Sequence, residues 1–414
     1  MRSYTILIDS THYNCLPNVI DCARFYRYLL KNDHKIVKNP KIADFIIINS
    51  CAFTENQQNK TVEIYNNYHK IKKRDAKIII YGCLENINPE LTKNLDCIKI
   101  KLKDGKKIDS IFLKTIKFED IEPYCTKKIQ ETLFGDKKEF STWFKTPFYL
   151  TKLFLPFSKK MKNNYHNLIK SVTYDKSNFV EISTGCTNNC SYCQIKKAKG
   201  NISSRKTKDI ISNIKEIYDP SKTLFLAADD CASYGFDKNQ DFIDLFNEIN
   251  KKFPDLKLDL NYLNPSCMEK NYDGYIKLFS SKKINLAIIP IQSGSQKIIN
   301  KMNRKYNVEK LLEKTLKIKE VSPKTILYAH FIVGFPGETF VDFIKTLIAA
   351  KYFDFPSAFF YSNEKGTKSY SFPNQKSKYV ILSRMLIFIF FVNFVILYRL
   401  KHYSKEVGEN NNDK

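Results

Sequence analysis

The chain of 414 residues is long enough for two or three domains, each with its own core. Lysine and arginine number 68 against 43 acidic residues, a formal charge of +25, which favours a polyanionic partner such as RNA. An AT-rich genome would give the same abundance of Lys, Asn, Ile, Phe and Tyr without any selection for RNA binding. Eleven cysteines without an evident secretory signal indicate a cytoplasmic, reducing compartment and metal ligation, and argue against a secreted disulfide-bonded protein.

Residues 1–116 alternate short β-branched runs with stretches suited to helices. The runs predict strands at 4–8, 45–48, 77–81 and 98–102. Such βα alternation predicts a small parallel sheet covered on both faces, with functional groups at the carboxyl ends of its strands. Cys15 follows the first strand by a loop, and Cys51 and Cys83 directly follow the next two strands. We therefore expect a three-thiolate metal site, the alternative being three buried thiols that only pack.

Residues 117–176 break this alternation. Between 137 and 170, eight lysines and one acidic residue are interleaved with aromatic side chains. This composition suits base stacking with phosphate contacts, a membrane interface, or a linker whose aromatics pack between two domains. We predict a basic, aromatic linker.

A second cysteine set follows a strand predicted at 179–182. Cys186, Cys190 and Cys193 have the spacing C-x3-C-x2-C, and no fourth cysteine lies nearby. Three such thiolates can ligate three irons of a [4Fe–4S] cluster, which leaves the fourth iron open for a substrate or cosubstrate. The alternatives are a zinc ribbon with a remote fourth ligand and thiols that only pack.

Residues 177–372 again alternate strands and helices. Six strands are predicted, near 179–182, 223–227, 256–262, 284–289, 325–333 and 357–361. Six βα units predict a partial TIM-like barrel, whose site lies at the carboxyl ends of its strands. The cysteine loop follows the first strand. Polar or glycine-containing runs follow the next four, at Asp229-Asp230, Asn264-Pro265, 292–295 and 334–338.

Together these motifs resemble the radical S-adenosylmethionine (SAM) methylthiotransferase family. The cysteine triad with Tyr192 before its last member resembles the radical-SAM signature, and the runs I-Q-S-G-S and F-I-V-G-F-P-G-E-T resemble that family's barrel. The runs N-C-L-P-N-V-I-D, N-S-C and G-C-L resemble its N-terminal domain. Three positions depart from the family: Asn14 replaces Gly, Asp229 replaces Gln, and His330 replaces Thr or Asp.

The resemblance implies two [4Fe–4S] clusters and SAM as cofactors. Cys186, Cys190 and Cys193 are implied to hold the cluster that binds SAM and cleaves it to a radical, and Cys15, Cys51 and Cys83 an auxiliary cluster that handles the inserted sulfur. Further residues implied near SAM are Tyr192 against the adenine, Gln292 and the backbone of Ser293, Gly294 and Ser295 at the nucleoside, and Arg205 and Asp230.

The implied reaction replaces a substrate C–H by C–S–CH3. One branch of the family acts on a modified adenosine beside the tRNA anticodon, and another on an aspartate of a ribosomal protein. We expect the tRNA substrate, the ribosomal protein or another peptide being the alternative, and an electron donor such as flavodoxin or ferredoxin. A candidate of another class is a membrane-tethered iron–sulfur protein that binds or transfers electrons without methylthio transfer.

Residues 373–414 depart from the family, which normally ends in a small β domain that binds nucleic acid. The stretch 379–400 is strongly apolar, and its 14 uncharged residues from 385 to 398 rise only about 21 Å as a helix, short of a roughly 30 Å hydrocarbon core. With Arg384 and Arg399 snorkelling, the whole stretch could span a membrane. A helix buried against the barrel and a protomer interface are the alternatives, and a polar tail follows.

Overall fold

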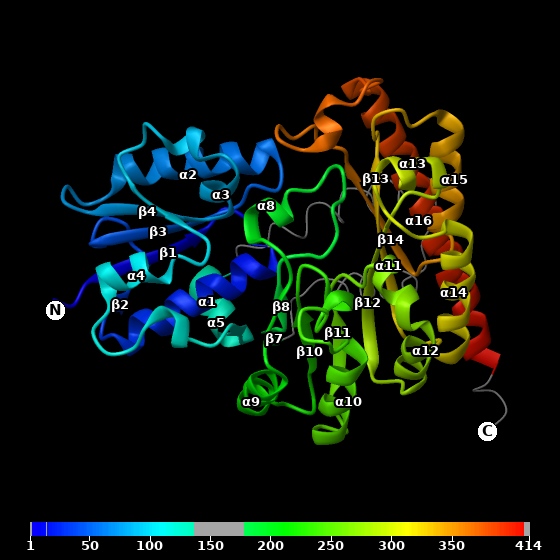
Figure 1. Cartoon of the computed structure of the whole chain (residues 1–414), viewed down its shortest axis with the longest axis horizontal. Helices are drawn as coiled ribbons and strands as arrows, with labels where there is room; N and C mark the ends of the chain where they lie inside the picture. Colours follow the sequence, from blue (N-terminus) through cyan, green and yellow to red (C-terminus); the bar gives the residue numbers. More distant parts are fainter. Residues whose placement is uncertain (1, 14, 136–177, 410–414) are drawn as a thin grey trace. The chain divides into compact units, whose positions relative to one another are not determined.

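The computed structural model describes residues 2–13, 15–135 and 178–409, with side chains up to residue 396 (Figure 1). The described residues divide into two compact units. The first comprises the residues up to 135 together with 178–188 and 193–241, and the second comprises 189–192 and 242–409. This division differs from the predicted domains 1–116, 117–176, 177–372 and 373–414, which stay predictions.

The first unit contains a five-stranded sheet in the order β2-β1-β3-β4-β5. All of its strand pairs are parallel. Its strands are β1 (Thr5–Ser10), β2 (Lys35–Ile36), β3 (Phe45–Ser50), β4 (Lys77–Gly82) and β5 (Ile98–Lys101). Four of the five coincide with the predicted runs. The central strand β3 is buried along its whole length, as expected for a parallel sheet with helices on both faces.

Alternate isoleucines of this sheet enter two separate cores. Ile6, Ile47 and Ile79 belong to one hydrophobic cluster, and their neighbours Ile46 and Ile78 belong to the other. The first cluster includes side chains of α1 (Leu16–Lys31) and α4 (Gly105–Phe112), and the second includes side chains of α2 (Glu55–Ile71). Each fully buried isoleucine contributes about 1.5–3 kcal/mol, so the two faces fix the register of the strands.

The remainder of the first unit holds shorter elements. These are α3 (Cys83–Ile87), η1 (Pro89–Thr92), η2 (Phe118–Asp120), β6 (Tyr124–Cys125), α5 (Lys127–Phe134), β7 (Asn178–Glu181), β8 (Ser183–Thr184), α8 (Ile195–Lys199), β9 (Ser203–Ser204), α9 (Thr207–Ile217), β10 (Thr223–Ala227) and η3 (Cys231–Ser233). β7 pairs in parallel with β10 and antiparallel with β6. The described start of the predicted linker 117–176 therefore contributes a strand and a helix, and its basic, aromatic part at 137–170 lies outside the described residues.

The second unit is a succession of parallel strands and helices, with strand order β14-β13-β12-β11. Its strands are β11 (Lys257–Leu260), β12 (Ile284–Gln292), β13 (Ile326–Val333) and β14 (Phe355–Phe360). Its helices are α10 (Phe242–Lys252), α11 (Pro265–Met268), η4 (Glu269–Asn271), α12 (Tyr272–Ser280), α13 (Gln296–Lys301), α14 (Val308–Val321), α15 (Phe340–Ala350), η5 (Lys368–Ser371) and α16 (Lys378–Glu409). This strand-helix alternation was predicted.

The apolar C-terminal stretch forms α16, which packs against β14, β13 and α15 (Figure 1). Met385, Phe388, Val392 and Ile396 are buried and recur every three or four residues, so one face of the helix is in the core. The segment Lys378–Ile396 is long and apolar enough to cross a membrane, but 33% of it is buried within the protein. Burial against the parallel strands is the alternative that the structure favours.

The snorkelling of Arg384, the condition for a full membrane span, is not what the structure shows. Its guanidinium is buried and lies 2.5 Å from the carboxylate of Glu338, a residue that follows β13. The Glu338 side chain is fully buried, and an unpaired carboxylate there would be costly, so the arginine turns into the protein. The side chain of Arg399 lies outside the described residues.

Candidate functional site

Cys15, Cys51 and Cys83 come together at the carboxyl edge of the five-stranded sheet. Cys15 caps α1, Cys51 directly follows β3, and Cys83 begins α3 directly after β4. Burial raises the pKa of the Cys51 thiol, and Cys15 and Cys83 both lie close enough to interact with it electrostatically. The structure therefore brings these three residues to one sheet edge, while their role as iron ligands stays a prediction.

The close approach of two of these strand ends depends on glycine. Gly82 has φ of 120°, and a Cβ there would lie 2.7 Å from the carbonyl oxygen of Ser50. A larger residue would push Cys83 away from the end of β3. Burial raises the pKa of Cys83 to about 12. The metal-free thiol therefore stays protonated at neutral pH, and a coordinated metal is what would convert it to a thiolate.

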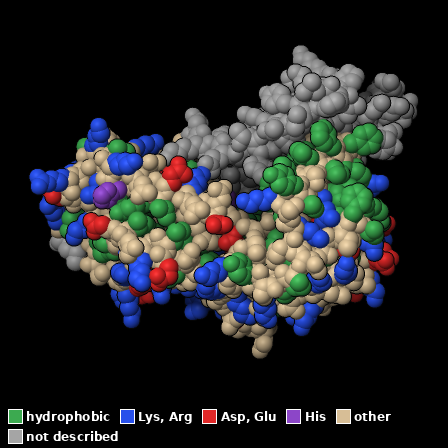
Figure 2. All heavy atoms as spheres, turned by 90° about the horizontal axis from the view of Figure 1, so that it is seen from above, with side chains coloured by type: hydrophobic (Ala, Val, Ile, Leu, Met, Phe, Trp, Pro, Cys, Tyr) green, Lys and Arg blue, Asp and Glu red, His purple; other side chains and the backbone are tan. Residues whose placement is uncertain are grey.

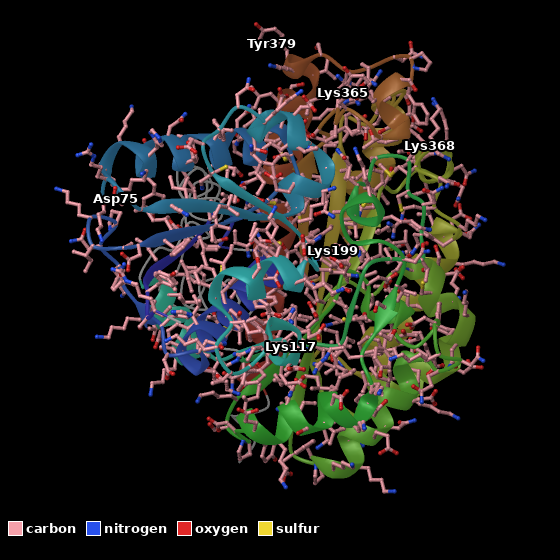
Figure 3. All side chains as sticks on the ribbon, turned by 60° about the vertical axis from the view of Figure 1, so that its left-hand side comes forward. Asp75, Lys117, Lys199, Lys365, Lys368 and Tyr379 are labelled. Atoms are coloured by element: carbon pink, nitrogen blue, oxygen red, sulfur yellow. The ribbon has the colours of Figure 1, made fainter. Side chains whose placement is uncertain are left out.

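A buried cation lies beside this cysteine triplet. The Nζ atom of Lys199, at the end of α8, lies 2.7 Å from Oδ1 of Asp229 (Lys199 is labelled in Figure 3). Its charge acts to lower the pKa of all three thiols. Burial acts to lower the pKa of Lys199 itself, but the adjacent Asp229 carboxylate opposes burial and the pKa is raised, so the ammonium stays charged.

The sulfurs of the second cysteine set each accept a hydrogen bond. The donors are Asn188 N to Cys186 Sγ at 3.4 Å, Ile195 N to Cys193 Sγ at 3.4 Å, and Arg304 Nη1 to Cys190 Sγ at 3.8 Å. Such donors favour the thiolate form and tune the potential of iron–sulfur clusters. The donor set therefore fits iron ligation.

A mononuclear metal fits this chain less well. Among residues 2–13, 15–135 and 178–396, no three His, Cys, Asp or Glu side chains are close enough together to hold one metal ion. The zinc alternative thus has no ligand set in the described part of the chain. A four-iron cluster is wider than one ion, and its cysteine ligands stand farther apart.

Arg304 is a candidate functional residue that the sequence analysis missed. It is buried in the turn between α13 and α14. Besides Cys190, its guanidinium donates to the Tyr192 hydroxyl at 3.3 Å, to Asn264 Oδ1 at 3.3 Å and to the Pro290 carbonyl at 2.9 Å. The only signal in the sequence is a basic residue after a short helix, which does not distinguish Arg304 from the many other cations.

The turn at the end of β12, which we predicted to lie near the nucleoside, contains a strained backbone conformation. Gln292 has φ of 71°, a conformation that is unfavourable for a residue with a Cβ and is common at functional sites. Ser295 Oγ donates to Asp342 at 2.7 Å, and a Cβ at Gly294 would lie 2.1 Å from the Lys345 carbonyl. The turn is thus docked on α15. Ser293 Oγ lies 3.2 Å from Thr346 Oγ1. Both serine side chains are used in packing, and the backbone remains the predicted SAM contact.

Arg205 and Asp230 have structural partners in the first unit. Arg205 donates to the Glu181 carbonyl and to Asn213 Oδ1, both at 2.7 Å, and forms an ion pair with Glu122. These contacts are enough to explain Arg205 without SAM. Asp230 Oδ2 accepts from Asn188 Nδ2 at 3.3 Å, and its Oδ1 accepts from the Ala232 backbone at 3.1 Å. Asp230 therefore supports the loop of Cys186, and the SAM contacts of both residues stay predictions.

His330 and four of the five remaining cysteines are buried. The His330 ring packs against those of Tyr262, Tyr328 and Phe359, and burial lowers its pKa to about 3, so it is neutral. The cysteines without a family counterpart are Cys22, Cys125, Cys231 and Cys267, all buried, and Cys97, which is half-buried. They pack as small hydrophobic residues.

Comparison with known proteins gives two family matches. Residues 180–349 match the Radical SAM superfamily, and residues 8–100 match the Uncharacterized protein family UPF0004. Among solved structures, the radical SAM methyltransferase TsrM from Kitasatospora setae, with cobalamin and a [4Fe-4S] cluster bound, is similar with a TM-score of 0.55. That match has 11% identity and covers 87% of this chain and 75% of TsrM, so it shows the fold alone. The partial TIM-like fold after an N-terminal domain is confirmed.

Two curated relatives extend over most of the chain. The ribosomal protein uS12 methylthiotransferase RimO of Thermoanaerobacter sp. (strain X514) is 30% identical over 380 residues, which are 89% of this chain and 79% of the relative. The tRNA-2-methylthio-N(6)-dimethylallyladenosine synthase of Buchnera aphidicola subsp. Cinara cedri (strain Cc) is 31% identical over 360 residues, with coverages of 82% and 74%. The predicted iron–sulfur and SAM cofactors are confirmed with the family. The chain belongs to the radical-SAM methylthiotransferases, enzymes that depend on SAM and iron–sulfur chemistry.

Proposed function

We propose that the enzyme transfers a methylthio group to a modified adenosine beside the anticodon of tRNA. The observation that carries this choice is the run from Gln292 to Ser295, which resembles the corresponding run of the tRNA branch. The formal charge of +25 is compatible with it, because it suits a substrate with many phosphates. One relative is named for a tRNA adenosine product.

An aspartate of a ribosomal protein is the second candidate. Asp230 with the following Ser-Tyr-Gly run resembles the branch that acts on this substrate, and another relative is named for ribosomal protein uS12. Charge does not separate the two candidates, since a ribosomal protein is itself surrounded by RNA. Mass spectrometry of tRNA nucleosides and of ribosomal proteins from a deletion strain separates them. Loss of the methylthio group from tRNA is expected, and its loss only from a ribosomal protein would overturn the tRNA proposal.

In this proposal the two cysteine sets divide the work. Cys186, Cys190 and Cys193 would hold the cluster that binds SAM, and Cys15, Cys51 and Cys83 would hold the auxiliary cluster. When bound, these groups supply the radical cleavage of SAM and the sulfur. The chain supplies N–H donors to the sulfurs, a fixed Tyr192 and a buried Lys199. A flavodoxin or ferredoxin would supply electrons.

Iron analysis tests the division. Anaerobically reconstituted protein is expected to hold about eight irons per chain, and Cys51→Ala about four. Cys22→Ala is the matched control, because Cys22 is also buried in the first unit and is expected to leave the iron content unchanged. A parental content of about four irons would instead support an electron-transfer protein without methylthio transfer.

We further propose that the cytoplasmic enzyme rests on an anionic membrane surface through α15 and α16. The outer faces of these packed helices expose apolar side chains, namely Phe340, Val341, Ile344, Ile348, Tyr379, Leu382, Leu386, Ile387, Phe390 and Phe394. In Figure 2 one dense group of hydrophobic side chains lies at the right of the view, and further groups lie elsewhere on the same face. In Figure 3, Tyr379 points away from the start of α16.

The charges around these helices favour a lipid surface over a second copy of the chain. Between residues 339 and 396 the exposed charged residues are all lysines, Lys345, Lys351, Lys365, Lys368 and Lys378. The acidic residues of this range, Asp342, Asp354 and Glu364, are buried or half-buried. A symmetric dimer through this face would bring like charges together, whereas anionic headgroups complement them and the apolar side chains enter the interface.

Cosedimentation with vesicles tests this surface. Parental protein is expected to bind vesicles containing phosphatidylserine and to bind weakly to pure phosphatidylcholine. Phe390→Ser with Phe394→Ser should abolish binding, while Leu316→Ser, an exposed apolar residue on α14, serves as the control. Concentration-dependent dimerisation without vesicle binding would overturn the proposal.

A further inference from the structure

Lys199 and Asp229 form a buried ion pair, and the proposed function names Lys199 without giving the pair a role. Their side chains are only 10% and 7% exposed, and the charged atoms lie 2.7 Å apart. Replacing such a pair by apolar side chains is often neutral or stabilising, so the pair is not explained by stability alone. Asp229 also stands where the family resemblance leads one to expect glutamine, which could not form an ion pair.

Each partner reaches a different cysteine set. Ala198, the residue before Lys199, packs with Ala52 and Leu84, which directly follow Cys51 and Cys83, and the Lys199 ammonium interacts electrostatically with all three thiols of the triplet. The second carboxylate oxygen of Asp229 accepts a hydrogen bond at 2.8 Å from the backbone N–H of Gly185, the residue before Cys186.

The backbone at Gly185 has little freedom to move. Its φ is 80°, and a Cβ there would lie 2.2 Å from the carbonyl oxygen of Asn201, in the facing segment of the same chain. The backbone that enters the Cys186 loop is thus held between this facing segment and the Asp229 carboxylate. A change in the carboxylate is therefore transmitted to the position of Cys186 rather than absorbed by a flexible loop.

Other charged groups share this region of the first unit. The carboxyl groups of Asp21 and Glu181 interact electrostatically with Lys199, and Arg24 interacts with both of these carboxyls. Lys199 is the cation that acts on all three thiols, and its effect on Cys15 and Cys83 exceeds the opposite effect of Asp229. Asp229 and Asp21 act against Lys199 at Cys15 and Cys83, so the charge felt by the triplet depends on whether Lys199 is present.

We propose that the Lys199–Asp229 pair is an electrostatic bridge between the two cysteine sets. Lys199 is the counter-cation that raises the reduction potential at the Cys15, Cys51 and Cys83 site, and Asp229 holds Lys199 while it positions the backbone before Cys186. This inference rests on the proposed binding of an auxiliary cluster by the triplet. A positive charge favours the reduced cluster because reduction adds negative charge, and local charge is one of the determinants of cluster potential.

The first test is a redox titration of the auxiliary cluster followed by electron paramagnetic resonance. The full chain carries Cys186→Ala, Cys190→Ala and Cys193→Ala, so that only the auxiliary cluster is observed. Lys199→Met is expected to lower the midpoint potential by about 59 mV or more, a tenfold change for a one-electron couple. Asp229→Asn should raise it by less, and Lys199→Arg should leave it nearly unchanged.

The opposite signs distinguish tuning by charge from a general loss of structure. Lys199→Met with Asp229→Asn removes both charges, avoids an unpaired buried carboxylate, and is expected to give a potential between those of the single variants. Shifts of the same sign, or none, would overturn the inference while leaving the cluster assignment intact. Absence of iron from the triple-alanine background would overturn the assignment and the inference with it.

The proposed role of Asp229 in positioning the backbone before Cys186 is tested by a separate measurement. With all cysteines present, Asp229→Asn keeps an acceptor for the Gly185 N–H, whereas Asp229→Ala removes it. Addition of SAM is expected to change the electron paramagnetic resonance spectrum of the Cys186 cluster. This change should persist in the asparagine variant and be lost in the alanine variant. Equal spectra for the two variants would overturn this role.

Discussion

The two cysteine sets are each served by one buried cation, and the two cations make different kinds of contact. Lys199 has one close partner, Asp229, and reaches the thiols through its charge. Arg304 donates hydrogen bonds to a sulfur, a phenol, an amide oxygen and a backbone carbonyl. The comparison leads us to predict that the N-terminal set depends on charge and the second set on geometry, which is the usual division between lysine and arginine.

Replacing each buried cation by the other basic residue tests this difference, and it should give the largest effect. Arg304→Lys keeps the charge but loses the planar fork that holds Cys190 and Tyr192, so we expect it to be nearly as damaging as Arg304→Met. Misplacement of these groups should lower the rate of 5′-deoxyadenosine formation from SAM about 100-fold. The lost buried hydrogen bonds should lower the free energy of unfolding by about 3 kcal/mol.

Lys199→Arg is the control for that exchange, because it keeps the charge that we assign to the N-terminal site. Rates are measured with a chemical reductant, and stabilities by urea unfolding of the metal-free proteins. An Arg304→Lys enzyme with the parental rate and stability would show that Arg304 also acts only through its charge.

Backbone geometry gives the next largest expected effect, and it concerns the N-terminal set. Gly82→Ala should destabilise the protein by about 2–4 kcal/mol, because the added Cβ meets the Ser50 carbonyl in a left-handed backbone conformation. It should also reduce the iron bound by the triplet. Gly200→Ala is matched to it: φ is 84°, but nothing described lies within 4 Å of the added Cβ, so we expect a loss of only about 1 kcal/mol.

Urea unfolding and iron analysis of both variants check this prediction. Equal losses in the two variants would mean that the left-handed conformation alone sets the cost. The close approach of the two strand ends would then contribute nothing measurable.

The sequence predicted those features that depend on local patterns. Cys51 and Cys83 could be placed at one sheet edge because β-branched runs identify parallel strands and each cysteine directly follows one. The pairings of Arg304 with Cys190 and of Lys199 with Asp229 could not be predicted. Arg304 and Cys190 are 114 positions apart, and a single cation in a lysine-rich chain carries no mark of its partner.

The same limit explains why the direction of the Arg384 side chain could not be predicted. An arginine at the edge of an apolar run is expected to snorkel when the surroundings are lipid. The sequence alone does not show that a fully buried carboxylate, that of Glu338, lies on the core side of the helix. The hydrophobic pattern identified α16 as apolar, but only the tertiary packing determined which way its charged residue turns.

A pair at the surface completes the comparison, and it should give the smallest effect. Asp44 lies 3.0 Å from Lys73, whose side chain is 44% exposed, and its Oδ2 accepts hydrogen bonds at 2.9 Å from both the backbone N and Oγ1 of Thr5. The backbone N–H of Thr5 contributes most to holding the pKa of Asp44 at about 2, with Lys73 adding less. The contrast with Lys199 and Asp229 predicts that here the backbone hydrogen bond, and not the ion pair, supplies the stability.

We therefore expect Asp44→Asn to lower the free energy of unfolding at pH 7 by about 1–2 kcal/mol and Lys73→Met by about 0.5 kcal/mol or less. Because the folded-state pKa of Asp44 is depressed, its contribution is complete above the unfolded pKa and is lost as the pH falls through about 2. Urea unfolding of the parental protein and Asp44→Asn between pH 7 and 2 should show their difference shrinking toward the acid end. A difference in the free energy of unfolding that stays constant with pH would mean that the Asp44 carboxylate contributes through its shape and not its charge. If Lys73→Met lowered the free energy of unfolding as much as Asp44→Asn does, the ion pair would be the source of the stability.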